Sequence, residues 1–320
     1  MRIAVLLLDG VFDTGLSAVL DAFTIANTFA QRSTRLVIER VALRRRVRTG
    51  QGLSVPLDPM PRRSPDIVVV PALGAKSPEA LDHALAQPEA KDAAALLRRW
   101  RSAGTTVAAA CTATFLVAAS TLLDGKPATT TWWLAAAFRE RFPKVALREA
   151  EMIVATPGLV TAGAALAHLD LALWIIRRRS PALARITARH LAFDRRPSQG
   201  AYVMPDHIAH SDALVERFEA WARRHLDGFT LSAAARAVGA STRTLERRMH
   251  RVLGKSPLAF VQDLRVEVAM SQLETTDRSV DEIAARVGYR DGSTLRALLR
   301  EKTGRGVREL RRRDVNRRTG

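Results

Sequence analysis

The sequence is poor in cysteine, in lysine and in long apolar runs. Only Cys111 is a cysteine among the 320 residues, so no disulfide forms within the chain, which excludes a disulfide-stapled secreted protein. The first apolar run, Ile3–Leu8, is followed at once by Asp9 and is shorter than the apolar core of a signal peptide. These features predict a cytoplasmic protein.

One uncharged stretch, Ser102–Leu123, is long enough to resemble a membrane span. It covers 22 residues but is rich in alanine and threonine, and a single span in the middle of such a chain would be unusual. We interpret it as a buried strand that turns into a buried helix, and we expect no membrane partner. With 47% hydrophobic and 26% charged residues, the chain has an ordinary globular composition, and its length favours two domains.

Positive charge exceeds negative charge along the whole chain. The formal net charge is +18, from 50 Lys+Arg against 32 Asp+Glu, and only six of the basic residues are lysine. Such an excess predicts a polyanionic partner such as double-stranded DNA. Residues 211–320 hold 23 basic and 15 acidic side chains, a net of +8, which leaves +10 for residues 1–210. Charge alone therefore does not locate a DNA-binding domain.

The first part of the chain alternates between strand-like and helix-like segments. This alternation predicts an α/β domain whose mainly parallel sheet is covered by helices on both faces. Strands are expected at 3–8, 36–43, 67–70 and 105–110, and helices at 16–30, 77–101, 112–123 and 164–178. A polar, proline-containing stretch follows, so we expect a first domain over 1–193, a linker over 194–212 and a second domain over 213–315.

The second domain contains an internal repeat. Residues 231–239 match residues 280–288, and Leu245 and Gly254 match Leu295 and Gly304. Each copy has the pattern of a short helix, a glycine-containing turn and a second helix. A generic helical bundle is the alternative, but two copies in register favour two helix-turn-helix modules and an all-α domain. Ser279 and Glu282 form a capping-box pattern at the start of the second copy.

The segment between the two copies predicts one long helix. Pro257 follows Ser256 and suits the first helical position, and an apolar face continues to Glu274. A helix of that length runs about 27 Å at 1.5 Å per residue. This is close to one turn of B-DNA, about 34 Å, so the second helices of the two modules would reach successive major grooves.

Residues 214–313 resemble the AraC/XylS family of transcription regulators. The motifs that carry the resemblance are S-T-R-T-L-E-R-R-M at 241–249, G-K-S-P at 254–257, Phe260 with Leu264, Arg265 and Ala269, I-A…V-G-Y at 283–289, and Gly304 with Arg311. Four apolar residues depart from the usual aromatic or proline residues of the family: Leu295, Leu299, Val307 and Leu310. The resemblance implies a regulator that binds double-stranded DNA and has RNA polymerase as a further partner. Whether it activates or represses stays open.

The second helix of each module is expected to contact DNA. In the first module Leu245, Met249 and Val252 form the core stripe, so the charged residues at 243–247 point away from it. Arginine bonds guanine in a bidentate manner, and glutamate accepts from cytosine N4. The alternative is a solvated helix face with Glu246 paired to a neighbouring arginine. The expected contacts are Thr242, Arg243, Glu246 and Arg247 in the first module and Ser293, Thr294, Arg296 and Arg300 in the second.

Cys111 lies where a predicted strand turns into a predicted helix, as the reactive residue of a nucleophile elbow does. Leu122-Leu-Asp-Gly125 and Ala128-Thr-Thr130-Thr-Trp132 follow it. Residues 1–193 resemble the DJ-1/PfpI domain of the glutamine-amidotransferase-like superfamily, in the version fused to AraC-type modules. The resemblance implies a flavodoxin-like fold.

The catalytic positions implied by this resemblance are replaced. Thr112 and Thr131 stand where relatives have histidines, and Gly15 stands where an acid approaches the cysteine. We therefore expect no enzyme activity, although a cysteine-dependent hydrolase or glyoxalase-like enzyme is the alternative. Cys111 is either an inherited buried residue, part of an effector pocket, or redox-active.

The expected effector pocket consists of Gly74, Cys111, Thr112 and Thr131, around backbone N–H groups at a helix N-terminus. A small carboxylate or amine-containing metabolite is the expected effector. We expect a homodimer formed through residues 1–190. No cofactor and no metal are expected, because His207 and His210 form only one pair of neighbouring histidines.

Overall fold

The computed structural model describes residues 1–194, 196, 198–202, 210, 212–304 and 306–311. The chain divides into two compact units, Met1–Gln199 and a second unit that begins at Gly200. The division falls after Gln199, six residues later than the predicted end of the first domain.

The N-terminal unit contains a six-stranded sheet in the order β2-β1-β3-β4-β8-β7. The strands β1 (Arg2–Leu7), β2 (Val37–Ala42), β3 (Ile67–Val70), β4 (Thr106–Ala110) and β8 (Leu159–Ala162) are parallel. β7 (Ile153–Thr156) runs antiparallel to β8 at the edge. The predicted α/β fold with a mainly parallel sheet is confirmed. A separate small pair is formed by β5 (Pro127–Ala128) and β6 (Ala146–Leu147).

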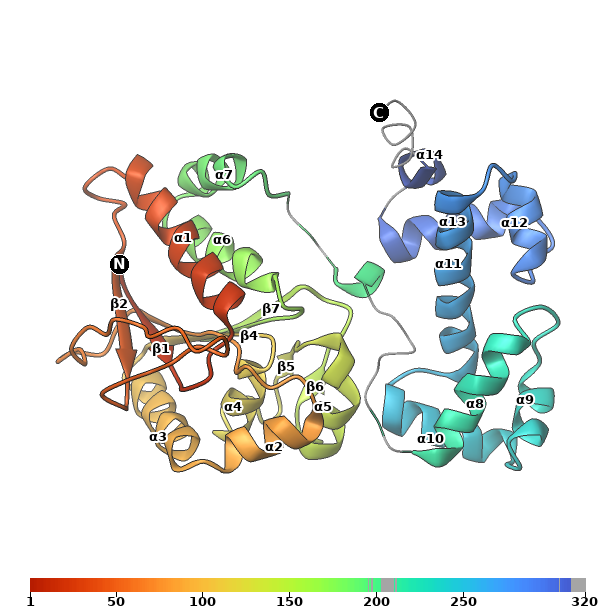
Figure 1. The fold of residues 1–320 in the computed structure, drawn as a ribbon, viewed down its shortest axis with the longest axis horizontal. Helices are drawn as coiled ribbons and strands as arrows, with labels where there is room; N and C mark the ends of the chain where they lie inside the picture. The colour runs from red at the N-terminus through yellow and green to blue at the C-terminus, as the bar shows by residue number, and fades with distance from the viewer. Residues whose placement is uncertain (195, 197, 203–209, 211, 305, 312–320) are drawn as a thin grey trace. The chain divides into compact units, whose positions relative to one another are not determined.

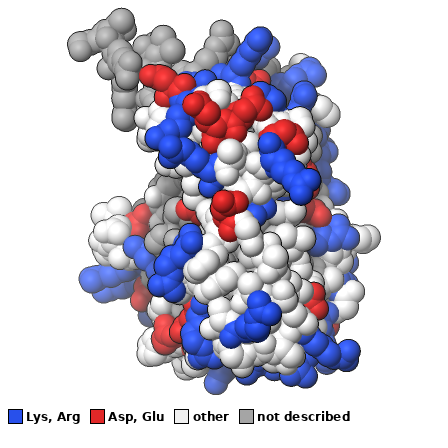
Figure 2. Space-filling view, turned by 90° about the vertical axis from the view of Figure 1, so that its right-hand side faces the viewer, with Lys and Arg blue, Asp and Glu red and all other residues white. Residues whose placement is uncertain are grey.

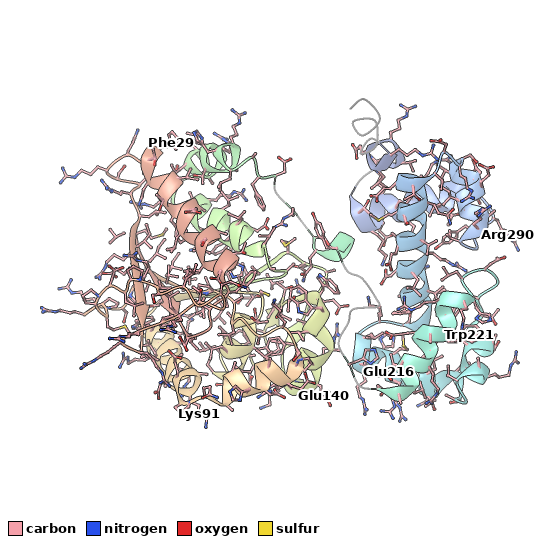
Figure 3. The ribbon with its side chains drawn as sticks, in the orientation of Figure 1. Phe29, Lys91, Glu140, Glu216, Trp221 and Arg290 are labelled. Atoms are coloured by element: carbon pink, nitrogen blue, oxygen red, sulfur yellow. The ribbon has the colours of Figure 1, made fainter. Side chains whose placement is uncertain are left out.

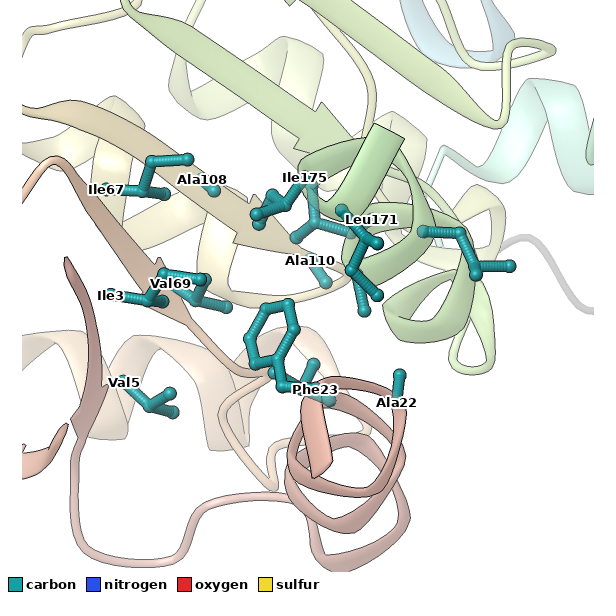
Figure 4. Packing of buried hydrophobic residues seen from close by; sticks show 14 of the residues in the cluster. Ile3, Val5, Ala22, Phe23, Ile67, Val69, Ala108, Ala110, Leu171 and Ile175 are labelled. Atoms are coloured by element: carbon teal, nitrogen blue, oxygen red, sulfur yellow. The ribbon is translucent and has the colours of Figure 1, made fainter. Parts of the chain in front are cut away.

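Helices cover both faces of this sheet (Figure 1). On one face lie α1 (Asp13–Phe29), α6 (Ala167–Arg179) and α7 (Pro181–His190), and on the other lie α3 (Pro88–Ser102) and α4 (Ala113–Ala119). Phe23 of α1 and Leu171 of α6 pack over Ile3, Val69 and Ala110 of the strands (Figure 4). The intervening strand residues, such as Val68 and Val70, are also fully buried, as expected for strands covered on both sides.

One prediction for this unit was wrong in detail, and one hairpin was missed. The helix expected over 77–101 is two helices, α2 (Pro78–Ala86) and α3, because Pro88 disfavours helical geometry at Gln87, whose ψ is 144°. The β7–β8 hairpin was not predicted. Its Pro157-Gly158 turn, with Gly158 at φ +78°, between two β-branched segments was the signal for it. The remaining elements are η1 (Trp132–Leu134) and α5 (Ala135–Arg141).

The second unit is all-helical over its described residues after η2 (Gly200–Tyr202). Its helices are α8 (Ala213–Arg224), α9 (Leu231–Ala237), α10 (Thr242–Leu253), α11 (Pro257–Thr275), α12 (Val280–Arg286), α13 (Gly292–Thr303) and α14 (Val307–Arg311). Trp221 of α8 (Figure 3) stacks on His225, the C-cap of this helix, with ring centroids 4.4 Å apart. The pairs α9–α10 and α12–α13 are the two predicted helix-turn-helix modules, and α11 is the predicted long helix between them.

Local sequence signals explain where these helices begin and end. Ser241, Ser256 and Ser279 each cap a helix with a side-chain oxygen, and the Ser279–Glu282 capping box is formed on both sides. Gly254 ends α10 in the left-handed region at φ +68°. The apolar residues that replace family aromatics are packed: Leu295 and Leu299 are fully buried and Leu310 is 4% exposed.

Candidate DNA-binding helices and the buried cysteine site

Helix α10 presents one apolar face and one charged face. Leu245, Met249 and Leu253 are buried against the rest of the unit. All four residues predicted to contact DNA in the first module, Thr242, Arg243, Glu246 and Arg247, are exposed. Neither Arg243 nor Arg247 forms an ion pair with a residue that the structure describes. This face is therefore free to meet an anionic surface.

A hollow of about 380 Å³ lies beside α10 and is lined by Leu214, Thr244, Arg247, Arg248 and Arg251. Arg248 bonds Asp212, the N-cap of α8, at 2.9 Å. The three arginines form a site suited to a phosphate group, since arginine recognises phosphate in a bidentate manner. Arg248 and Arg251 were not predicted as site residues, although their spacing on the helix places them beside Arg247.

Helix α13 differs from α10 at its N-terminus. Asp291 caps it and accepts hydrogen bonds from the backbone N–H groups of Ser293 and Thr294 and from the hydroxyl of Ser293. The Ser293 hydroxyl and these amides hold the pKa of Asp291 below its usual range. Arg296 lies 3.6 Å from Asp281. All four predicted contacts are exposed: Ser293, Thr294, Arg296 and Arg300. Asp291 engages the first two, and Asp281 lies beside Arg296.

The surface charge of the second unit is mixed (Figure 2). Lys and Arg side chains are scattered over this face, whereas Asp and Glu side chains gather mainly in its upper part. Arg290, in the turn before α13, points into solvent (Figure 3).

The two modules are joined through Arg265 of α11. Its guanidinium donates from Nε and Nη2 to the carbonyl of Leu226, at 3.1 and 2.5 Å, and lies 4.8 Å from the ring centre of Tyr289. Leu226 lies between α8 and α9, and Tyr289 lies in the turn of the second module. This arginine therefore links the loop before the first module to the turn of the second module. Its motif was recognised in the sequence, but this role was not.

Cys111 is at the turn from β4 to α4, as predicted. Its φ is +56°, a left-handed conformation that non-glycine residues rarely adopt. Its N–H donates to the Ala162 carbonyl at 2.9 Å, and its carbonyl accepts from the Thr130 hydroxyl at 2.9 Å. The thiol is buried, and burial raises its pKa to about 11, opposed by the Thr112 amide and by the hydroxyls of Thr131 and Thr112. The thiol is thus protonated at neutral pH.

The other three predicted pocket residues differ in their burial. Thr112 and Thr131 are buried beside the thiol, and the Thr112 hydroxyl donates to the Leu73 carbonyl at 2.7 Å. Gly74 is exposed, and its N–H donates to the Gly10 carbonyl at 2.9 Å. That N–H is therefore not available to a ligand, contrary to the role expected for it. The structure brings Cys111, Thr112 and Thr131 together as buried side chains.

His168 is the only other fully buried titratable group near this end of the sheet in the described N-terminal residues. Its Nε2 accepts from the Ala72 N–H at 3.0 Å, and its Nδ1 lies 2.5 Å from the Ala165 carbonyl. Burial lowers its pKa to about 4, so the imidazole is neutral at pH 7. Because backbone groups engage both nitrogens, His168 is a satisfied buried imidazole, as predicted, and is not a base for the thiol.

Within the described residues, no group of three or more His, Cys, Asp or Glu side chains is arranged to hold a metal ion. His207 lies outside the described residues, and His210 bonds Glu219 at 3.2 Å. None of the described helices is long and apolar enough to cross a membrane.

Comparison with known proteins identifies both units. Residues 1–178 match the DJ-1/PfpI family model. The chain belongs to the DJ-1/PfpI family. Residues 234–313 match a helix-turn-helix domain model, and this C-terminal domain is of the AraC type. A putative transcriptional regulator from Vibrio parahaemolyticus shares the fold of the DJ-1/PfpI unit, with a TM-score of 0.52 and 19% identity over 60% of this chain and 98% of that chain.

Curated relatives resemble the C-terminal part of this DJ-1/PfpI protein. The HTH-type transcriptional activator RhaS of Enterobacter sp. (strain 638) is 30% identical over 105 residues, which cover 32% of this chain and 38% of that protein. RhaS of Salmonella schwarzengrund (strain CVM19633) is 30% identical over 102 residues, 32% of this chain and 37% of that protein. The chain thus spans less than two fifths of the curated relatives that it matches.

Proposed function

We propose that this protein is a cytoplasmic, sequence-specific DNA-binding transcription regulator whose DJ-1/PfpI unit senses a small molecule, forms a dimer and does not catalyse a reaction. The observation that carries the proposal is the exposed face of α10, where Thr242, Arg243, Glu246 and Arg247 project from a helix anchored by buried leucine and methionine. That pattern of donors and acceptor suits the edges of base pairs in a major groove.

The spacing of the modules supports binding along one face of a duplex. Asp263 of α11 bonds Lys255, just after α10, and Lys302 of α13, both at 2.9 Å, and Arg265 of α11 bonds the Leu226 carbonyl before α9. Two recognition helices fixed in this way suit successive major grooves. Because the relatives are named transcriptional activators, we propose that this protein activates its target genes and that RNA polymerase is a further partner.

The state of Cys111 argues against nucleophilic catalysis. A nucleophilic cysteine needs a lowered pKa and a base within hydrogen-bond reach. The buried thiol instead has a raised pKa, threonines line it, and backbone groups occupy both nitrogens of His168. The alternative is a cysteine-dependent hydrolase or a glyoxalase-like enzyme. In that case the purified wild type would turn over a substrate and Cys111→Ser would not. We expect no turnover to lose.

The test is capture of genomic DNA by the purified full-length chain, followed by sequencing. A few enriched sites are expected, and a variant with Arg243, Glu246 and Arg247 changed to alanine should lose them. Arg185→Ala on α7 is the matched control and should retain them. Absence of any enriched site would overturn the proposal. Light scattering of the same protein tests the dimer, and a monomer at micromolar concentration would remove that part.

A further inference from the structure

The side-chain amide of Gln199 is held in a cradle of oxygen atoms. Its nitrogen donates to the carbonyls of Glu149 and Thr130, at 2.6 and 2.8 Å, and lies 3.2 Å from the hydroxyl of Thr129. Carbonyls only accept hydrogen bonds, so the nitrogen of the carboxamide, rather than its oxygen, must face them. Gln199 is fully buried. Three residues thus form a fixed site for an N–H donor.

The cradle is shaped closely around the carboxamide. A Cβ on Gly163 would lie 2.5 Å from Cδ and Oε1 of Gln199, so only glycine leaves room for the group. The oxygen Oε1 of Gln199 is buried and has no hydrogen-bond partner among the described residues. A buried acceptor without a donor is uncommon in native proteins. The carboxamide nitrogen of Gln199 therefore has three acceptors, whereas the carboxamide oxygen has no donor among the described residues.

The cradle connects the cysteine turn to the end of the N-terminal unit. Thr130, whose carbonyl receives the Gln199 amide, donates its hydroxyl to the Cys111 carbonyl. Gln199 is also the last residue of this unit, and its own N–H donates to the Ala150 carbonyl at 2.9 Å. The residue that fills the cradle thus fixes the point at which the chain leaves toward the DNA-binding unit.

We propose that this cradle is the effector site of the N-terminal unit and that Gln199 is its built-in occupant. The proposal rests on the proposed function and names the chemical class of the effector. Three oxygen acceptors select a group with N–H donors, such as a primary carboxamide, an ammonium or a guanidinium group, and disfavour a carboxylate. A ligand that displaces Gln199 removes the anchor of the following segment and so changes how the second unit engages DNA.

The ligand specificity is tested by filling an emptied cradle. Gln199→Ala removes the equivalent of one acetamide molecule, so acetamide is the probe and acetate, of similar size without the N–H donors, is its control. Relative to acetate, acetamide should raise the Tm of full-length Gln199→Ala by about 2 °C or more. It should not do so in the wild type or in Gln31→Ala, an exposed glutamine. Equal effects of the two probes on Gln199→Ala would overturn the ligand class.

The coupling is tested with Gln199→Met, which keeps the size of the side chain and removes its donors. Amide hydrogen exchange at residue 199 should become about tenfold faster in the full-length chain. The affinity for a duplex that the wild type binds should change by about fivefold or more, and Gln31→Met should change neither quantity. Faster exchange with unchanged DNA affinity would overturn the coupling. If the wild type binds no DNA, the proposed function fails, while the acetamide comparison still decides the cradle.

Discussion

Gly15 of α1 packs directly against the imidazole of His168 on α6. A Cβ at Gly15 would lie 2.6 Å from His168 Nε2, inside any real contact distance. Gly15 is the position at which the DJ-1/PfpI resemblance places an acidic residue near the cysteine. The space for such a side chain is thus filled by a buried ring, which gives a physical reason for the glycine.

Gly15→Ala should destabilise the N-terminal unit by about 1–3 kcal/mol, because the added methyl group has to displace the buried ring. In a His168→Ala background the same substitution should cost much less, since the ring is gone. Chemical denaturation of the four proteins of this double-mutant cycle measures the coupling. Additive free energies would show that the two residues do not compete for the same space.

His168 should make the N-terminal unit sensitive to acid. Its folded pKa of about 4 lies below the ordinary value of 6.5, so the unfolded chain binds the proton first as the pH falls. The contribution to stability is therefore present above pH 6.5 and is lost as the pH falls toward 4, by up to about 1.4 kcal/mol per pH unit. The free energy of unfolding in urea should fall between pH 7 and pH 5 in the wild type. His83→Gln, at an exposed histidine, should show the same fall, and His168→Gln a smaller one.

Arg247→Ala should weaken binding to a specific site by about 1–3 kcal/mol and relax the base preference at one position. The guanidinium is exposed on α10 and has an arginine-lined hollow beside it. Binding to specific and random duplexes, measured at one salt concentration, separates the two possible contacts. Equal losses on both duplexes would mean that Arg247 contacts phosphate only.

The first module should carry more sequence information than the second. In α13 the Asp291 carboxylate engages Ser293 and Thr294, and Asp281 lies beside Arg296. On α10, in contrast, Arg243 and Arg247 form no ion pair with a residue that the structure describes. Arg300 is then suited to phosphate contacts, which give affinity without sequence preference. Substitution of each base pair in a bound site measures the asymmetry, which stronger preferences in the α13 half-site would contradict.

Arg265→Met should destabilise the second unit by about 1–3 kcal/mol, because the Leu226 carbonyl loses its buried donor. The loss of specific DNA binding should be larger than for Arg224→Met, an exposed arginine of α8, since Arg265 contacts both the Leu226 loop and the Tyr289 ring. Affinity for duplexes with one base pair added between the half-sites measures the preference for half-site spacing, which Arg265→Met should weaken. An unchanged preference for spacing in Arg265→Met would show that the contact does not set the geometry.

Much of the fold was predictable because its signals are local. Alternating strands and helices, the capping serines and the repeat near Gly239 and Gly288 each specify their element without long-range information. The helix break at Pro88 and the turn at Gly158 had local signals too. The break was missed because the apolar periodicity over 77–101 continues across Pro88. Long-range contacts were not predictable: Gln199 meets Thr130 and Glu149, and Arg265 meets Leu226, from 39 to 69 residues away in the sequence. The buried state of Cys111 likewise depends on how distant segments pack.

The most direct test of DNA recognition by α10 is selection of bound sequences from a random duplex library by the full-length chain. A defined enriched sequence is expected, with its strongest base preferences in the half bound by α10. Arg243→Ala and Arg247→Ala should each relax the base preference at a position within that half and leave the other half intact. Enrichment of no sequence by the wild type, or enrichment of the unchanged wild-type sequence by both variants, would contradict recognition by α10.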